Sequence, residues 1–131
     1  MHREVDIQLT LAARAHELPG VRQMIRAIGR TLHVDEELEG HMLLAVDEAC
    51  ANVVAHAYSP DHPDALMHIR AHTQADEIVF VVSDQGSPIT TGKSPGAGMG
   101  LSLIRAISDE FEIEGPGDDG TRVTIHFRLP T

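Results

Sequence analysis

The sequence predicts one α+β domain, a two-layer sandwich with about three helices on one face of a mixed or antiparallel sheet of about five strands. Two observations predict it. Segments with strand and helix periods follow one another in the order strand, helix, helix, strand, strand, helix, strand, strand. Most of the strands are joined by short turns, which favours hairpins with the helices on one side. Because no repeat or linker is visible, residues 1–131 are expected to form a single domain.

The first strand and the first two helices follow from simple periodicities. Residues 5–11 alternate apolar and polar side chains, as a half-buried strand does. A helix is expected from about Pro19 to His33, with one apolar stripe formed by Leu18, Val21, Ile25, Ile28 and Leu32. A second helix begins after Asp35, whose side chain suits an N-cap, and runs to about Tyr58, before a proline-rich loop.

The second half of the chain contains four strands and a third helix. Residues 65–73 alternate, whereas residues 77–84 form a nearly continuous apolar run, which predicts a central strand covered on both faces. Residues 85–100 are too rich in Gly, Pro, Ser and Thr for regular structure, and a helix follows them. The last two strands flank a tight turn at residues 116–120.

Composition excludes several classes of function. Twenty acidic residues against ten basic ones give a formal net charge of −10, which repels nucleic acids and anionic membrane surfaces. The single cysteine, Cys50, has no partner for a disulfide within the chain, and this fits a reducing compartment. The alternating N-terminus is unlike a signal peptide, and no apolar run is long enough to span a membrane. We therefore expect a soluble cytoplasmic protein.

The second helix carries an unusual polar stripe in "DEACANVVAHAY", residues 47–58. Glu48, Asn52 and His56 follow one another at four-residue spacing, so they share one side of a helix. Their neighbours are small and apolar, without the Lys and Arg of a solvated face. A carboxylate and an amide in such surroundings need a partner, which protein, water or a ligand could supply.

Two glycine-containing segments lie downstream. "GAGMGL", residues 96–101, precedes a helix, so its backbone N–H groups could approach an anion. It matches neither the dinucleotide fingerprint nor the P-loop. "SDQG", residues 83–86, places Asp84 at the end of a strand, where it either makes an ordinary turn or accepts a hydrogen bond from an amine. Gly86 would let a flat ring lie against the backbone.

Taken in order, "EACANVVAHAY", "DQGSP", "GAGMGL" and "GTRV" resemble the four sequence boxes of the GHKL ATPase superfamily. The resemblance covers essentially the whole chain. The "HAY" and "D-x-G-x-P" forms are most similar to the anti-sigma-factor serine kinases of bacteria. This resemblance implies a Bergerat-type fold that holds ATP and Mg²⁺ between its helices and its sheet.

The resemblance also implies a role for each matching residue. Glu48 would be the catalytic carboxylate that orients or deprotonates the attacking hydroxyl group, and Asn52 would bind Mg²⁺. Asp84 would accept a hydrogen bond from the adenine amino group, with support from Thr121. The other residues expected to contact the nucleotide are His56, Gly86, Lys93, Gly96, Gly98, Gly100 and Leu101.

Three functions stay open on the sequence alone. The first is an anti-sigma-type serine kinase, by resemblance a homodimer, that sequesters a sigma factor and phosphorylates a serine on an anti-anti-sigma protein. The second is a binding module that keeps the fold with little or no kinase activity. Only residues 87–97 lie between Gly86 and Gly98, fewer than expected for this family, and Lys93 is the one cation among them.

The third possibility is a fragment of a histidine kinase, because "HELPG" at His16 faintly resembles a phosphoacceptor box. That box belongs on a long helical hairpin, for which too little chain is available here. A metal site built from the nine histidines is not expected. His68 and His72 share a strand face but lie about 13 Å apart, so we expect surface histidines.

Overall fold

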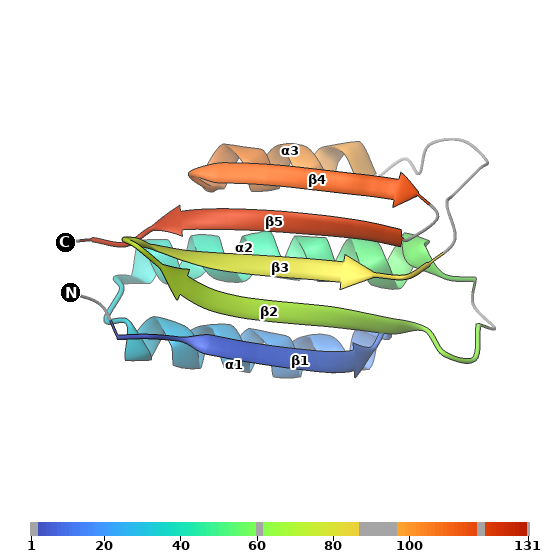
Figure 1. Cartoon of the computed structure of the whole chain (residues 1–131), viewed down its shortest axis with the longest axis horizontal. Coiled ribbons are helices and arrows are strands. Elements are labelled where there is room, and N and C mark those ends of the chain that lie inside the picture. The colour runs from blue at the N-terminus through green and yellow to red at the C-terminus, as the bar shows by residue number, and fades with distance from the viewer. Residues whose placement is uncertain (1–2, 60–61, 87–96, 118–119, 131) are drawn as a thin grey trace.

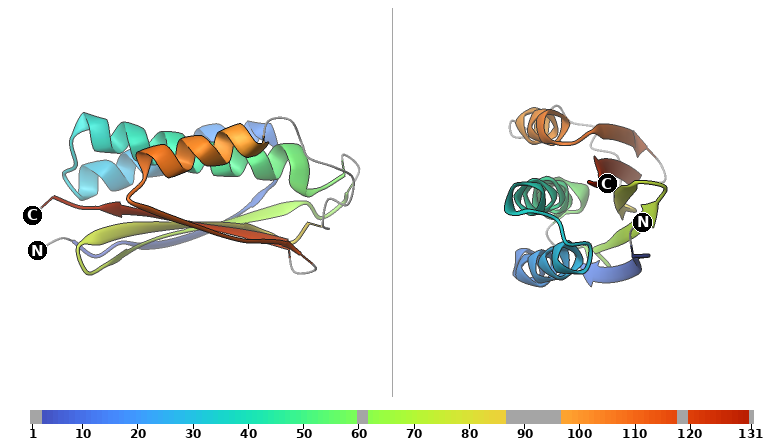
Figure 2. Two further views of the ribbon diagram at one scale, coloured as in Figure 1. Left: turned by 90° about the horizontal axis from the view of Figure 1, so that it is seen from above. Right: turned by 90° about the vertical axis from the view of Figure 1, so that its left-hand side faces the viewer.

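Three helices pack on one face of a five-stranded sheet, as the sequence predicts (Figures 1 and 2). The computed structural model describes residues 3–59, 62–86, 97–117 and 120–130. All strand pairs are antiparallel. In their spatial order the strands are β1 (Asp6–Ala12), β2 (Leu66–Gln74), β3 (Glu77–Asp84), β5 (Gly120–Arg128) and β4 (Glu110–Gly117).

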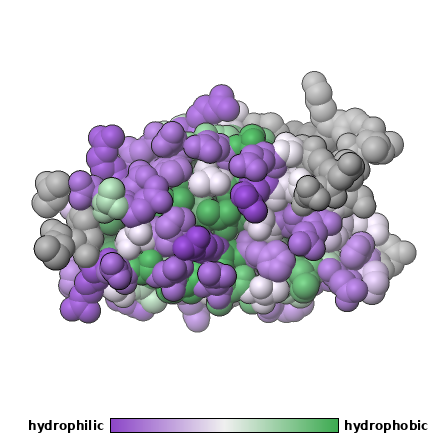
Figure 3. All heavy atoms as spheres, in the orientation of Figure 1, coloured by the Kyte–Doolittle hydropathy of each residue, from purple (hydrophilic) through white to green (hydrophobic). Residues whose placement is uncertain are grey.

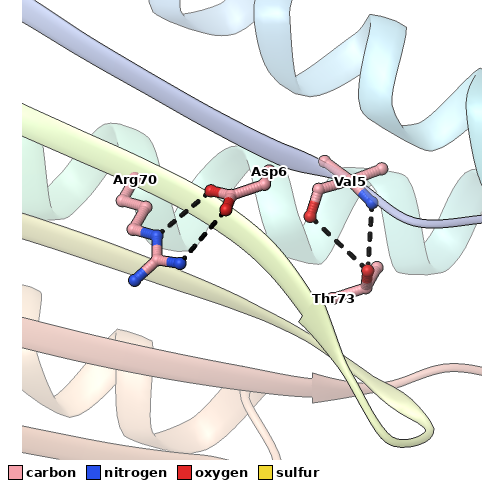
Figure 4. Close-up of polar contacts among 4 residues, drawn as sticks. All are labelled: Val5, Asp6, Arg70 and Thr73. Carbon is pink, nitrogen blue, oxygen red and sulfur yellow. Dashed lines mark hydrogen bonds and ion pairs between the residues drawn. The ribbon is translucent and has the colours of Figure 1, made fainter.

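The edge strand β1 is fastened to β2 by side chains as well as by its backbone ladder. Arg70 donates two hydrogen bonds of 3.2 Å to the carboxylate of Asp6. The hydroxyl group of Thr73 lies 3.0 Å from the backbone nitrogen of Val5 (Figure 4). These contacts hold β1 at the edge of the sheet.

The helices are α1 (Leu18–Thr31), α2 (Glu36–Asn52) and α3 (Ala97–Ile107). The apolar stripe predicted for α1 is buried in full. The predicted N-cap of α2 is confirmed, since the Asp35 side chain accepts a 2.8 Å hydrogen bond from the backbone N–H of Leu38. Arg22 and Asp47 join α1 to α2 through an ion pair of 2.7 Å.

The core lies between the two layers. Phe80 of β3 and Phe127 of β5 meet edge to face, with ring centroids 6.1 Å apart. Cys50 of α2 is fully buried, and its burial raises the pKa of the thiol to about 12. A thiol in this state is unreactive.

The outer face of the sheet carries no helix within the described residues, and it faces the viewer in Figures 1 and 3. Hydrophilic side chains surround a hydrophobic strip there (Figure 3). The prediction that β3 is covered on both faces is therefore wrong. Val79 is buried by its neighbours on this face, but Val81 and Ser83 are only half-buried. The expectation of surface histidines also fails at His126, which is buried.

No helix in the described parts of the chain has both the length and the apolar character needed to cross a membrane. His16 lies exposed in a short 3-10 turn, Ala15–Glu17, between β1 and α1. It is not on the long hairpin that a phosphoacceptor histidine requires, so the described residues give no support to the histidine-kinase fragment.

Candidate functional site

The polar stripe of α2 ends in a change of helical type. Glu48 and Asn52 lie on α2 and are half-buried. The chain then continues as a π-helix, Val53–Ala57, which contains His56. The prediction of one regular helix to Tyr58 is therefore wrong beyond Asn52. Because a π-helix has a wider turn than an α-helix, the four-residue spacing that placed His56 on the stripe does not hold beyond Asn52. Such turns are frequent at functional sites.

Asp84 is a buried carboxylate at the end of β3. It is 6% exposed, and its Oδ1 accepts a 2.9 Å hydrogen bond from the backbone N–H of Gly86. Burial raises the pKa of Asp84 above its ordinary value, while backbone hydrogen bonds from Gly86 and Thr121 oppose that shift. Thr121 is also the direct partner of Asp84 across β3 and β5. The fold thus fixes the orientation of this carboxylate with two backbone amides.

Two glycines allow the backbone to pass close to Asp84. A Cβ atom on Gly86 would lie 2.6 Å from the carbonyl carbon of Ala57 in the π-helix. Gly120 has a φ angle of +89°, and a Cβ atom there would lie 2.8 Å from the carbonyl carbon of Asp84. Sequence reasoning assigned no role to Gly120. Its place as the first residue of the "GTRV" box was the signal that could have identified it.

Tyr58 ties the π-helix to two strands. Its hydroxyl group donates a 2.6 Å hydrogen bond to the carbonyl oxygen of Leu66, at the start of β2. The same oxygen accepts a 3.0 Å hydrogen bond from the backbone N–H of Gln85, directly after Asp84. Tyr58 therefore positions the turn that holds the Asp84 carboxylate, a role that sequence reasoning did not assign to it.

The glycine box forms the start of α3. The helix begins at Ala97, so Gly98 and Gly100 lie in its first turn, although the sequence placed them in a loop before the helix. Leu101 is half-buried and packs against the hydrophobic core. Gly96 and Lys93 lie outside the described residues.

The candidate residues gather at one end of the molecule. The π-helix contacts β3, and α2 contacts α3. In Figure 1 the end of α2, the end of β3, the start of β5 and the start of α3 all lie at the right. This end holds a buried carboxylate, a half-buried carboxylate and amide on α2, and a glycine-rich helix N-terminus. Such a set can bind an amine, an anion and a divalent cation.

Comparison with known proteins decides the family. Residues 11–127 match the family described as the histidine kinase-like ATPase domain. The chain belongs to this family. The boxes quoted above lie within the matched range, and the five-stranded antiparallel sheet with three helices is the GHKL-like fold expected for it.

Relatives within the family include serine kinases and anti-sigma factors. The serine-protein kinase RsbW of Bacillus pumilus is 28% identical over 87% of this chain and 82% of its own length. The anti-sigma F factor of Heyndrickxia coagulans is 26% identical over 98% of this chain and 95% of its own length.

Solved structures confirm the fold. The RsbU and RsbW domains of a Mycobacterium tuberculosis protein match with a TM-score of 0.76 and 23% identity over 95% of this chain. A histidine kinase domain from Erythrobacter litoralis matches with a TM-score of 0.62 and 22% identity over 87% of this chain. This chain spans 32% of the mycobacterial protein and 60% of the Erythrobacter protein.

Proposed function

We propose that this protein is an ATP-dependent serine kinase of the anti-sigma type. It would sequester a sigma factor and phosphorylate a serine on an anti-anti-sigma protein, as a homodimer in the cytoplasm. The observation that carries the proposal is Asp84, a buried carboxylate that two backbone amides orient between Gly86 and Gly120. The names of the relatives support the partner class.

The hydrogen-bonding capacity of Asp84 fits the amino group of adenine. A carboxylate has about four lone-pair sites, and the amides of Gly86 and Thr121 occupy only part of them. The exocyclic amino group of adenine is a donor that can use the rest. The space that side chains on Gly86 and Gly120 would take is filled by the carbonyl groups of Ala57 and Asp84, so these glycines leave no gap for a ring and the fit to adenine depends on the remaining lone pairs of Asp84.

The end of α2 and the start of α3 fit the phosphates and their metal ion. Gly98 and Gly100 offer backbone N–H groups at a helix N-terminus, where anions are favoured. Asn52 supplies an amide oxygen, a ligand type that Mg²⁺ accepts. Bound magnesium would neutralise charge that develops on the phosphates during transfer.

Glu48 is the residue we assign to the attacking serine. It lies one helical turn before Asn52, on the same side of α2, and is half-buried. Its carboxylate would orient the serine hydroxyl group and accept its proton while the oxygen bonds to the γ-phosphorus and ADP leaves.

The proposal is tested by phosphate transfer from labelled ATP to an anti-anti-sigma protein captured with this chain. Wild-type protein should label one serine on that protein, and Glu48→Gln should reduce the labelling about 100-fold or more without loss of ATP binding. Equal labelling by the two proteins would remove Glu48 from its proposed role.

A second candidate function is a partner-binding regulator without kinase activity. The short segment 87–97 between Gly86 and Gly98 favours it, because Lys93 is the one cation there that could hold phosphates. Under this alternative the chain captures a sigma factor equally well with and without ATP, and no label reaches the antagonist.

A further inference from the structure

A second group of polar side chains lies on the outer face of the sheet, opposite the helices. His126 of β5 pairs directly with Glu110 of the edge strand β4, and Glu112 follows on the same face of β4. A ring nitrogen of His126 and one carboxylate oxygen from each glutamate lie within 4.8 Å of one another. An imidazole nitrogen and carboxylate oxygens are donors that Zn²⁺ uses in proteins.

His126 distinguishes this group from an ordinary acidic surface. It is only 9% exposed, although it points away from the helices. Its Nδ1 lies 3.0 Å from Oε1 of Glu77, on β3, which flanks β5 on the side away from β4. Because an ionised carboxylate only accepts hydrogen bonds, Nδ1 of the neutral ring carries the proton and Nε2 carries the lone pair.

The Nε2 atom of His126 has no hydrogen-bond partner among the residues that the structure describes. His126 thus offers a ring nitrogen with a free lone pair, on a side chain that is only 9% exposed and that lies in one group with two carboxylates, and such a nitrogen is suited to a metal ion. A carboxylate on the other ring nitrogen is also the usual support of a metal-bound histidine, since it fixes the tautomer and the ring orientation.

We propose that Glu110, Glu112 and His126 form a binding site for Zn²⁺ or a similar first-row divalent cation, with Glu77 as the residue that orients His126. Water would complete the coordination. The site is separate from the proposed nucleotide site, because it lies on the outer face of the sheet, whereas α2 and α3 cover the inner face (Figure 2).

The ligands need only small movements to close on an ion. Around a tetrahedral Zn²⁺ the ligand atoms lie roughly 3.3 Å apart, given metal–ligand distances of about 2.0–2.2 Å. Glu110 and Glu112 are exposed, so their side chains can rotate inward, while packing holds His126 in place. The ion would also offset the negative charge of three glutamates around one imidazole.

The test is a titration of the full chain, without an affinity tag and in metal-free buffer, with Zn²⁺ alone in a calorimeter. The wild type should bind one Zn²⁺ per chain, and the metal should raise its melting temperature. The double variant Glu110→Gln, Glu112→Gln should lose this binding. Both side chains are exposed, so the fold of the variant should persist.

Two further variants separate the site from general surface binding. Glu77→Gln should weaken Zn²⁺ binding about 10- to 100-fold, as expected for a residue that supports a ligand. Glu114→Gln removes the next outward carboxylate of β4, outside the cluster, and should leave binding unchanged. If wild-type protein binds no Zn²⁺, or if the double variant binds it equally well, these glutamates only keep the edge strand charged, and the proposal is overturned.

Discussion

The backbone of Gly86 lies so close to the carbonyl group of Ala57 that no side chain fits between them. This contact joins the turn after β3 to the π-helix at the end of α2. It therefore places the carboxylate of Asp84 next to the helix that carries Glu48 and Asn52. The relationship explains why the second box requires glycine, for a reason independent of any ligand.

Gly86→Ala should lower the free energy of unfolding by about 1–3 kcal/mol, because the added methyl group forces backbone to move. ATP binding should weaken with it. Gly40→Ala is the matched control, since Gly40 lies in α2 with open space around it and alanine favours helix by about 0.5–1 kcal/mol. Denaturant unfolding measures both variants. Equal stability of Gly86→Ala and wild type would contradict the close contact.

Asp84→Asn should weaken ATP binding about 10- to 100-fold, the value of a hydrogen bond to a charged group. Its effect on stability should depend on pH. Because burial raises the pKa of Asp84, the folded state holds this proton more tightly than the unfolded chain. The contribution of Asp84 to stability is thus greatest below pH 3.8, its ordinary pKa, and falls as pH rises through the raised pKa.

The measurement for Asp84 is denaturant unfolding of wild type and Asp84→Asn at about pH 3.5 and pH 7. On going from the lower to the higher pH, the free energy of unfolding of the variant should rise relative to that of the wild type. The reason is that asparagine carries no charge to desolvate. A difference that is the same at both pH values would show that the carboxylate is not desolvated in the folded protein.

Tyr58→Phe removes the hydroxyl group that bridges Leu66 and Gln85. The free energy of unfolding should fall by about 0.5–1.5 kcal/mol, the usual contribution of a hydrogen bond. The turn at Asp84 loses one support, so the affinity for ATP should fall as well. Calorimetric titration with ATP provides the readout, and an unchanged affinity would assign Tyr58 to stability alone.

The adjacent carboxylates of α2 should behave in opposite ways. Glu48→Gln should reduce phosphate transfer about 100-fold or more with little change in stability, as expected on loss of a general base. Asp47→Asn breaks the ion pair with Arg22 and should lower stability only slightly, because solvent screens the pair, while transfer continues. Parallel kinase assays and melting curves separate the two. Loss of transfer in both variants would indicate a distortion of α2 instead.

Most of the fold is predictable because each element carries its own local signal. The apolar stripe of α1 and the cap at Asp35 depend on neighbours within a few residues. The π-helix at 53–57 is not predictable in this way. The segment has an ordinary helical pattern, and the wider turn becomes visible only where Ala57 meets Gly86.

The residues of the two sites also differ in how far the sequence predicts them. Glu48, Asn52 and Asp84 stand out in the sequence because polar groups interrupt apolar segments. The pairing of His126 with Glu77 joins residues 49 positions apart, and it depends on the register between β3 and β5. Sequence periodicity places each residue on a strand face but does not fix that register, so the outer cluster was missed.

The most direct test of the central claim is calorimetric titration of the full chain with ATP and with GTP, each with Mg²⁺. Asp84 should accept a hydrogen bond from the adenine amino group, whereas guanine presents a carbonyl oxygen there and is repelled. We predict one ATP per chain, no comparable binding of GTP, and a loss of ATP affinity in Asp84→Asn. A Kd of about 1 mM corresponds to a binding free energy of only about −4 kcal/mol. Absence of ATP binding at about 1 mM nucleotide would therefore contradict the account.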